Sequence, residues 1–176
     1  MAVVPRNKQR AIPQSWLVPF DRSWAELVVS WVRDANEAYW LAPKTPPPLT
    51  SLSILRWRAP DHHRYLLMED GGPEPVAYGE LNRMTGGARR YWLGHLIVDG
   101  QRRGQGYGLQ LTRLLLEEAF ERRGARQVTL VVFPENKAAL ACYRAAGMRD
   151  DGWETHDFPA YTRRATLVRL VATRFP

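Results

Sequence analysis

The stretch VDGQRRGQGYGLQL, residues 98–111, joins an apolar, strand-like segment to a leucine-rich segment with helical periodicity. Glycines occupy positions 104, 106 and 108, directly after two arginines. The first amides of a helix have no partner within the helix and carry partial positive charge, and glycine lets the backbone approach a ligand without a Cβ in the way. The stretch therefore predicts an anion site, for a phosphate group first of all, where a strand leads into a helix.

Two common phosphate-binding motifs do not fit this stretch. A dinucleotide fingerprint needs a third glycine three positions after the second, and Leu109 and Leu111 hold the two positions where it could stand. A P-loop needs Gly-Lys followed by Ser or Thr, and the sequence has no such run. The stretch also follows strand-like segments joined by short turns instead of opening a βαβ unit, so a Rossmann site is not expected.

The rest of the chain reads as a mixture of strands and helices. Apolar and alternating patterns predict strands over 15–20, 64–69, 76–84, 89–98, 127–133 and 166–175, of which 64–98 form an antiparallel meander. Helical periodicity predicts helices over 23–40, 51–57, 109–124 and 136–147. A capping box of Ser23 and Glu26 is expected to begin the first helix. The proline-rich segment 42–49 is expected to be a stiff connection.

Composition limits the class of protein. The 176 residues predict one domain, with about the first ten flexible. The net charge is +7, and 22 of the 25 basic residues are arginine, which favours anionic partners such as nucleotide phosphates, RNA or a charged cofactor. No apolar run is long enough for a membrane span, and the first residues have no secretory apolar region. A lone Cys142 favours a reducing cytoplasm.

At the glycine stretch the chain resembles the GNAT superfamily of acetyltransferases. The signature of that family is Arg/Gln-x-x-Gly-x-Gly/Ala between its fourth strand and third helix, and a proline is common where this chain has Gly100. The resemblance implies that loop amides hold the pyrophosphate of acetyl-CoA and that the preceding strand binds the pantetheine arm. The cofactor-binding residues expected from this are Leu96, Ile97, Val98, Arg103, Gly104, Gln105, Gly106, Tyr107 and Gly108.

A second match lies in NKAALACYRAAGM, residues 136–148. The family has an asparagine opening this helix, a tyrosine seven residues later and a glycine at its end. Asn136 and Tyr143 share one helix face and could meet one ligand. The resemblance implies that both contact acetyl-CoA and that Tyr143 is the acid near the CoA sulfur, although Asn136 as a simple N-cap and Tyr143 as a core residue stay open. Cys142 points about 100° away and is expected to be a buried, small, apolar residue.

The resemblance implies a fold and an activity. The fold is α/β (α+β): a mixed, mostly antiparallel sheet of six to seven strands with about four helices, and strands that splay at the acetyl-CoA site. The activity is that of an acetyl-CoA-dependent N-acetyltransferase, which moves the acetyl group directly to a primary amine of a small molecule or a protein N-terminus. Acetyl-CoA would be a co-substrate. No metal is expected, because the adjacent His62 and His63, in an expected loop, lack further ligands.

The sequence offers several candidates for the general base and does not choose among them. Some family members carry a glutamate or histidine at the position of Gly94. His95 is next to it but should face the other side of the strand unless a bulge re-aims it. Glu80, on the preceding strand, is another candidate, and a water chain without a dedicated base also stays open. His156 and its neighbour Asp157 are further candidates for the acceptor cleft.

The acceptor is open as well. Residues 31–41 resemble the branch that contains ribosomal-protein N-terminal and aminoglycoside 6'-N-acetyltransferases, but the basic charge disfavours polycationic amines unless the pocket is acidic. Trp40 or Trp57 could wall the cleft. Two other functions compete: a CoA-binding module without efficient catalysis, and a basic nucleic-acid or ribosome-binding protein. The second is disfavoured because no strand or helix interleaves aromatic with basic residues. A monomer and a homodimer are both compatible with the sequence.

Overall fold

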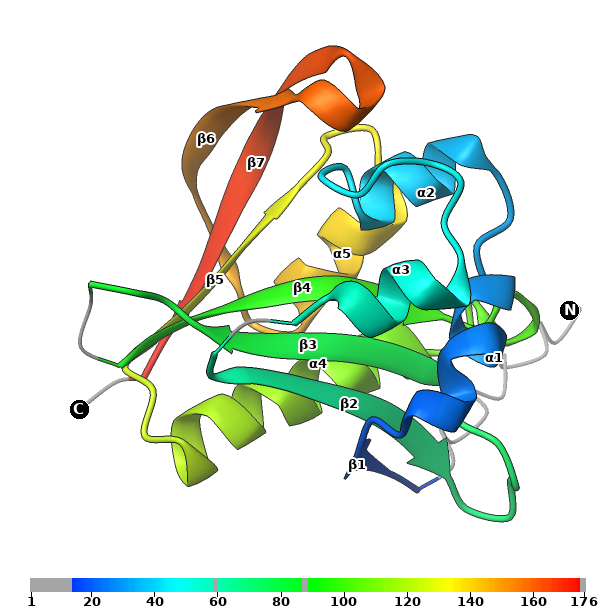
Figure 1. Cartoon of the computed structure of the whole chain (residues 1–176). Helices are drawn as coiled ribbons and strands as arrows, with labels where there is room; N and C mark the ends of the chain where they lie inside the picture. The colour runs from blue at the N-terminus through cyan, green and yellow to red at the C-terminus, as the bar shows by residue number, and fades with distance from the viewer. Residues whose placement is uncertain (1–13, 59, 87–88, 175–176) are drawn as a thin grey trace, which may run out of the picture.

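A seven-stranded sheet runs through the molecule in the order β1-β2-β3-β4-β5-β7-β6 (Figure 1). The computed structural model describes residues 14–58, 60–86 and 89–174, so the expected flexible segment 1–10 lies outside them. Neighbouring strands are antiparallel except for the parallel pair β4 and β5. The strands are β1 Ser15–Pro19, β2 His62–Glu69, β3 Ala77–Arg83, β4 Arg90–Val98, β5 Gln127–Val132, β6 Arg149–Phe158 and β7 Arg163–Thr173.

Helices cover both faces of this sheet. Alternate residues of a strand point to opposite faces, so Leu67 and Leu81 pack with Leu111 of α4, whereas Leu66 and Tyr78 pack with the helices of the other face. That second face carries α1 and α3 (Figure 1). The helices are α1 Ala25–Ser30, α2 Ala35–Leu41, α3 Ser51–Arg56, α4 Tyr107–Glu117 and α5 Lys137–Ala145, with a π-helical turn Glu118–Arg122 after α4.

The strands β4 and β5 separate after a short common stretch. They pair only where Arg90–Trp92 meets Gln127–Thr129, although β4 continues to Val98. Beyond this point β5 pairs with β7, and Figure 1 shows β4 and β5 diverging. The backbone of β4 after Trp92 therefore has no sheet partner on its β5 side. The expectation of a mixed sheet with splayed strands is confirmed.

The prediction of one helix over 23–40 is wrong. A 3₁₀ turn and α1 end near Ser30, and α2 begins anew at Ala35. Asp34 has an extended backbone with φ −154° and ψ 175°, and its side chain accepts a hydrogen bond from the Glu37 amide. An aspartate that caps a helix in this way begins a new one, and the apolar stripe concealed that break.

The predicted capping box is wrong too. Asp21 caps the first turn, because its carboxylate accepts a hydrogen bond from the Ser23 amide at 2.8 Å. Glu26 instead accepts a hydrogen bond from the Ser51 hydroxyl at 2.5 Å and so ties α1 to α3. The capping box that does form is at α3, between Thr50 and Ser53.

Two strands differ from expectation. β2 begins at His62, so His62 and His63 lie on a strand and not in a loop. β6 was not predicted, because its sequence RDDGWETHDF lacks an apolar alternation and most of its side chains are exposed. It lies at the sheet edge and pairs only with β7 among the described residues. The other predicted strands and helices are confirmed to within three residues at each end, provided that the helix over 109–124 is taken as α4 together with the π-helical turn after it. Residue 175 of the predicted last strand lies outside the described residues.

Candidate active site

The glycine loop presents backbone at the start of α4. Gly106 is the N-cap, with φ +92°, and no side chain caps the helix there. The amides of Tyr107, Gly108 and Leu109 are thus the first of the helix and lack partners within it. Gly104 also has positive φ, and a Cβ there would meet nothing within 4 Å. An open set of unpaired amides at the positive end of a helix suits an anion.

The loop arginines point into the protein instead of toward a ligand. Arg103 donates from Nε to the Val98 carbonyl at 3.1 Å and from Nη2 to the Trp31 carbonyl at 2.8 Å, and it also pairs with Glu37. Arg102 pairs with the buried Glu69 at 2.8 Å. The side chain of Arg103 is thus engaged within the protein, and only its backbone is available for the expected contact with a cofactor. Its guanidinium group connects the glycine loop to Trp31 and to Glu37 of α2.

The Glu37 carboxylate binds two arginines from different segments. Its Oε1 accepts from Arg33 Nε at 2.8 Å and also binds Arg103 from the glycine loop. Burial alone would raise the pKa of Glu37, but hydrogen bonds from the two arginines outweigh it and lower this pKa to about 2. The carboxylate thus stays ionised and joins α2 to the loop.

Two further loop side chains have internal partners. The Tyr107 ring is buried, and its hydroxyl donates a hydrogen bond to Glu69. Gln105 Nε2 donates to the Gln101 carbonyl at 3.1 Å. The side chains of Tyr107 and Gln105 are thus engaged within the protein, and only their backbone amides are available for the expected contact with a cofactor.

Helix α5 packs against α4 and carries Asn136 at its N-cap and Tyr143 two turns later. Asn136 Oδ1 caps the helix by accepting from the Ala139 amide at 3.2 Å, which leaves its Nδ2 for a ligand. The Tyr143 hydroxyl makes no hydrogen bond within the described residues, and burial raises its pKa, so it stays protonated near neutral pH. The Cys142 sulfur lies against Gly108, and burial raises the thiol pKa. Cys142 is thus a packing residue, not a nucleophile.

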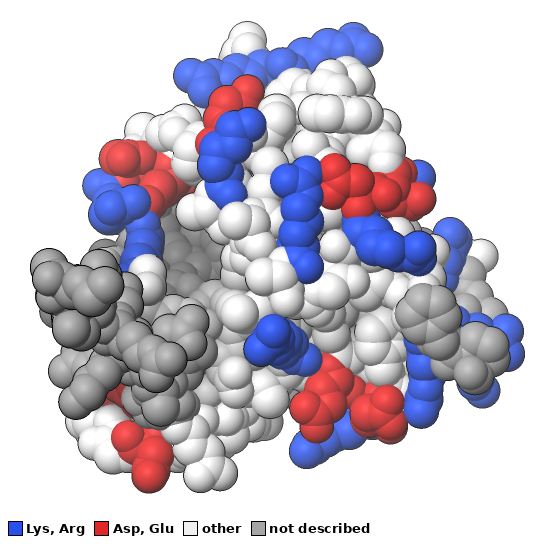
Figure 2. Space-filling model, turned by 180° about the vertical axis from the view of Figure 1, so that it is seen from behind, with Lys and Arg blue, Asp and Glu red and all other residues white. Residues whose placement is uncertain are grey.

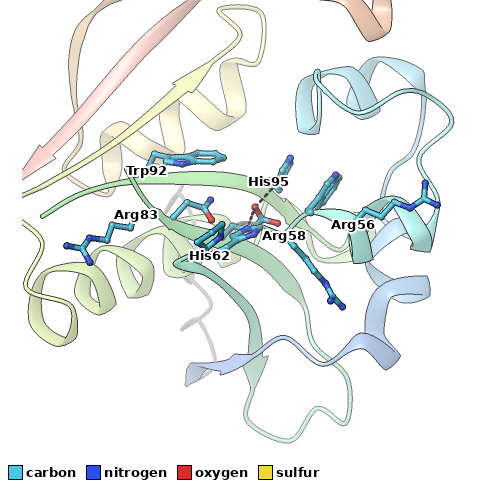
Figure 3. Close-up of a pocket in the computed structure, with 10 residues that line it drawn as sticks. Arg56, Arg58, His62, Arg83, Trp92 and His95 are labelled. Atoms are coloured by element: carbon cyan, nitrogen blue, oxygen red, sulfur yellow. Dashed lines mark hydrogen bonds and ion pairs between the residues drawn. The ribbon is translucent and has the colours of Figure 1, made fainter. Parts of the chain in front are cut away.

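A pocket of about 250 Å³ opens on the sheet face that carries α3 (Figure 3). Strands β2, β3 and β4 supply its floor, and residues at the end of α3 and just after it supply one wall. Its lining residues are Arg56, Trp57, Arg58, Pro60, His62, Glu80, Asn82, Arg83, Trp92 and His95.

Glu80 is fully buried at the bottom of this pocket, and its carboxylate is hydrogen-bonded to two histidines. Its Oε2 lies 2.7 Å from His62 Nε2 and 2.7 Å from His95 Nδ1, and Tyr78 donates to Oε1 at 2.5 Å. Burial would raise the pKa of Glu80, but the charge and hydrogen bonds of the two histidines lower it to about 2. Since the carboxylate can only accept, both facing ring nitrogens carry hydrogen. A neutral His95 then has its lone pair on Nε2.

A bulge turns His95 toward Glu80. Tyr78 faces Ile97 and Glu80 faces Gly94, so β4 holds one more residue than β3 at this point. His95 has φ +50°, and its ring stacks on Trp57 with 3.8 Å between centroids and 7° between planes. Its Nε2 has no hydrogen-bond partner within the described residues and is not enclosed. The re-aiming that a bulge could produce is therefore observed, and Glu80 and His95 come together.

The position of Gly94 is closed to a base in this chain. The Trp92 indole folds over Gly94, and a Cβ at Gly94 would lie 2.2 Å from Trp92 Cζ3. Trp92 and Gly94 are two residues apart on β4 and share one face. Where some relatives carry a glutamate or histidine, this chain therefore has an indole, and His95 is the titratable group next to it.

Other expected residues lie elsewhere or were missed. His156 and Asp157 are on β6, where His156 lies 2.9 Å from Glu154, and neither lines the pocket. Trp57 lines the pocket, whereas Trp40 does not. His62 was missed because it was assigned to a loop. Extending the alternation of the following strand back by two residues would have placed it on the same face as Arg64.

Surface charge, helix hydropathy and possible metal ligands give little support for a different kind of functional site in the described residues. Figure 2 shows the molecule from behind, where basic side chains are scattered and several adjoin acidic ones. Ion pairs such as Arg144 with Asp150, at 2.7 Å, offset part of the basic charge. In residues 14–58, 60–86 and 89–174, no helix is long and apolar enough to cross a membrane. The same ranges contain no cluster of three or more His, Cys, Asp or Glu side chains that could hold a metal.

Comparisons with known proteins agree with this geometry. The profile described as "Acetyltransferase (GNAT) family" matches residues 15–148. The thialysine N-epsilon-acetyltransferase of Bos taurus is 31% identical over 102 residues, which are 54% of this chain and 59% of that protein. The chain thus spans less than two thirds of that curated relative.

Two solved structures share the fold at low identity. The aminoglycoside acetyltransferase AAC(6')-Ib in complex with coenzyme A has a TM-score of 0.71 and 20% identity, with 92% of this chain and 95% of the other covered. A chimera of the spermidine N-acetyltransferase SpeG from Vibrio cholerae has a TM-score of 0.73 and 18% identity, with 91% and 95% covered. The profile match, the splayed sheet and the glycine loop lead to one conclusion: this chain belongs to the acetyltransferase (GNAT) family.

Proposed function

We propose that this protein transfers an acetyl group from acetyl-CoA directly to the primary amine of a small molecule or of a protein N-terminus. The observation that carries the proposal is the pair of His95 and Glu80. His95 lies on the part of β4 that has separated from β5, with the glycine loop at the end of that strand, and Glu80 lies on the neighbouring strand β3. Both residues line the pocket.

The residues present fit acetyl-CoA. The free amides at Gly106 and after it would hold the pyrophosphate. The backbone groups of Leu96–Val98 that face away from β3 would hold the pantetheine arm, apart from the Val98 carbonyl, which Arg103 already occupies. Asn136 Nδ2 is a further donor on that side. Acetyl-CoA supplies a thioester, whose acyl–sulfur bond breaks as the amide bond forms.

Two side chains of the protein move protons in this reaction. His95 Nε2 accepts a proton from the acceptor ammonium, and the buried Glu80 carboxylate stabilises the resulting imidazolium. The Tyr143 hydroxyl donates a proton to the departing sulfur, and the second proton that the amine nitrogen loses as the amide forms replaces it through solvent. His95 then releases the first proton to solvent. The overall reaction releases the amide, CoA with its thiol protonated, and one proton.

This arrangement favours catalysis over a CoA-binding module without efficient catalysis. That alternative rested on the missing base at Gly94, and His95 supplies a titratable group beside it. We also propose that the protein is cytoplasmic, because its one cysteine, Cys142, is free. Monomer and homodimer are equally compatible with the proposal.

A thermal-shift measurement with acetyl-CoA, CoA and ATP at matched concentrations tests the cofactor. A ligand at 100 times its Kd stabilises by about 2.7 kcal/mol, which is several degrees for a domain of this size. Stabilisation by acetyl-CoA but not by ATP, followed by free-thiol release with a panel of amines, is the expected result. No shift with any CoA species, or no thiol release with any amine, would contradict the proposal.

A further inference from the structure

Part of the pocket holds polar atoms that the protein leaves unsatisfied. Asn82 is 5% exposed, and both its Nδ2 and its Oδ1 are enclosed without a hydrogen-bond partner in the described part of the chain. His62 Nδ1 is in the same condition. Buried amide groups are nearly always hydrogen-bonded, so a buried side chain with two unsatisfied atoms in a pocket indicates a partner from outside the chain, a bound water or the polar group of a ligand that displaces it.

The sheet register places these atoms beside the proposed base. His62 faces Asn82 across β2 and β3, and Asn82 faces Trp92 across β3 and β4. Glu80 is two residues before Asn82 on β3, a spacing of about 7 Å along the strand. A molecule with its amine at His95 would therefore reach Asn82 within a few bonds. The Trp92 indole, 38% exposed, covers this part of the pocket.

The charges around the pocket favour an anionic group at that place. Glu80 is the one carboxylate in the described lining, and its oxygens are already bonded to His62, His95 and Tyr78. No lining carboxylate is thus left for a second ammonium group. Three arginines, Arg56, Arg58 and Arg83, stand around the rim (Figure 3). Arg83 lies 3.9 Å from Asp61, whereas Arg56 and Arg58 have no ion-pair partner among the described residues, so the net charge at the rim is positive.

We propose that the acceptor is an amino acid: a primary amine in a molecule that also carries a carboxylate. The carboxylate accepts a hydrogen bond from Asn82 Nδ2, and Asn82 Oδ1 accepts an N–H of the same molecule. This inference rests on the proposed function, since it names the substrate class of the same site. It separates this chain from enzymes that act on polycations, because a second positive charge meets arginines and no free carboxylate.

Matched pairs of amines test the inference. Each pair contains an amino acid and its decarboxylated counterpart: lysine with cadaverine, ornithine with putrescine, phenylalanine with phenethylamine and tryptophan with tryptamine. Spermidine, kanamycin and a short peptide complete the panel. The readout is kcat/KM from free-thiol release at saturating acetyl-CoA. We expect the carboxylated member to be at least about tenfold better in every pair that is turned over.

Three outcomes separate the two proposals. Equal or better turnover of the decarboxylated members would overturn the amino-acid inference and leave the acetyltransferase function intact. Turnover of spermidine, kanamycin or the peptide alone would do the same. No thiol release with any amine would count against the proposed function itself.

A variant connects the preference to Asn82. Asn82→Asp replaces the donor Nδ2 by a carboxylate oxygen of the same shape, so the preference for the carboxylated member should fall about tenfold or more. Ser15→Ala, which also removes an unsatisfied buried polar atom but on β1, is the matched control and should keep the preference. The thermal shift with CoA shows that each variant is folded. A preference unchanged in folded Asn82→Asp would overturn the role of Asn82.

Discussion

The two halves of the site are built in different ways. On the cofactor side, consecutive residues of one loop and the start of α4 present backbone amides, and the side chains of Arg103 and Tyr107 turn inward to hold the loop. On the acceptor side, side chains from α3, β2, β3 and β4 meet around Glu80. Backbone groups bind what every member of a family shares, and side chains are free to select the acceptor. Substitutions should therefore affect the two halves separately.

The largest effect is expected for His95→Ala. Loss of the base should lower kcat/KM for the amine by about 10²–10⁴ and remove the increase of rate with pH that deprotonation of the base produces. The thermal shift with acetyl-CoA should stay unchanged. His63→Ala is a suitable control, since His63 is the neighbouring histidine on β2 but does not line the pocket. A variant that keeps the wild-type rate and pH profile would exclude His95 as the base.

Tyr143→Phe should have the next largest effect, about ten- to a hundredfold on kcat. The hydroxyl has no partner within the described residues, so its removal should disturb the fold little. The measurement is kcat across pH, with acetyl-CoA affinity followed in parallel. Full kcat at every pH would show that another group protonates the departing sulfur.

Gly106→Val should act on the cofactor side alone. Gly106 has φ +92°, which is strained by about 1–3 kcal/mol for other residues, so the first amides of α4 should move. The KM for acetyl-CoA should increase about tenfold, while the KM for the amine stays constant. Gly152→Val places a similar strain, at φ +102°, on the edge strand β6, which contributes no residue to the glycine loop or to the pocket lining, and is the control. An equal loss in both KM values would break the proposed separation.

Replacing Trp57 should have a smaller effect on kcat, through the acceptor side of the site. It stacks on His95 and donates from Nε1 to Thr45 Oγ1 at 2.9 Å, which fixes the ring. Trp57→Leu should lower kcat about tenfold by loosening the imidazole, with little change in the KM for acetyl-CoA. Trp57→Phe keeps an aromatic face and should recover most of the activity. Equal losses in both variants would indicate a packing role without stacking.

The smallest expected effect is on stability. The pKa of Glu37 is about 2 in the folded protein, below its ordinary value of 4.5, so its ionised form stabilises the fold above pH 4.5 and this contribution disappears as the pH falls toward 2. Glu37→Gln should lower Tm by about 3 °C at pH 7. The difference from wild type should shrink as the pH falls from 4.5 to 2. A difference independent of pH would contradict this assignment.

Local sequence predicted the cofactor side better than the acceptor side. The glycine spacing and the asparagine before α5 are properties of short segments. The loop, the starts of α4 and α5 and most strands could therefore be predicted. The direction of His95 depends on one extra residue in β4, and a single-residue shift reverses every side chain after it. His62 joined the site because β2 is longer than its apolar pattern. β6 could not be predicted, since an exposed edge strand needs no apolar alternation.

The indole over Gly94 has a consequence for how this sequence can change over evolutionary time. A glutamate or histidine placed at 94 collides with Trp92 at once, because even a Cβ would lie 2.2 Å from the ring. The half-exposed Trp92 ring must swing away or become smaller before a side chain can be accepted at 94. The two positions are therefore epistatic: each substitution has a different effect depending on which occurs first. Descendants of this chain should keep the His95 arrangement unless both positions change.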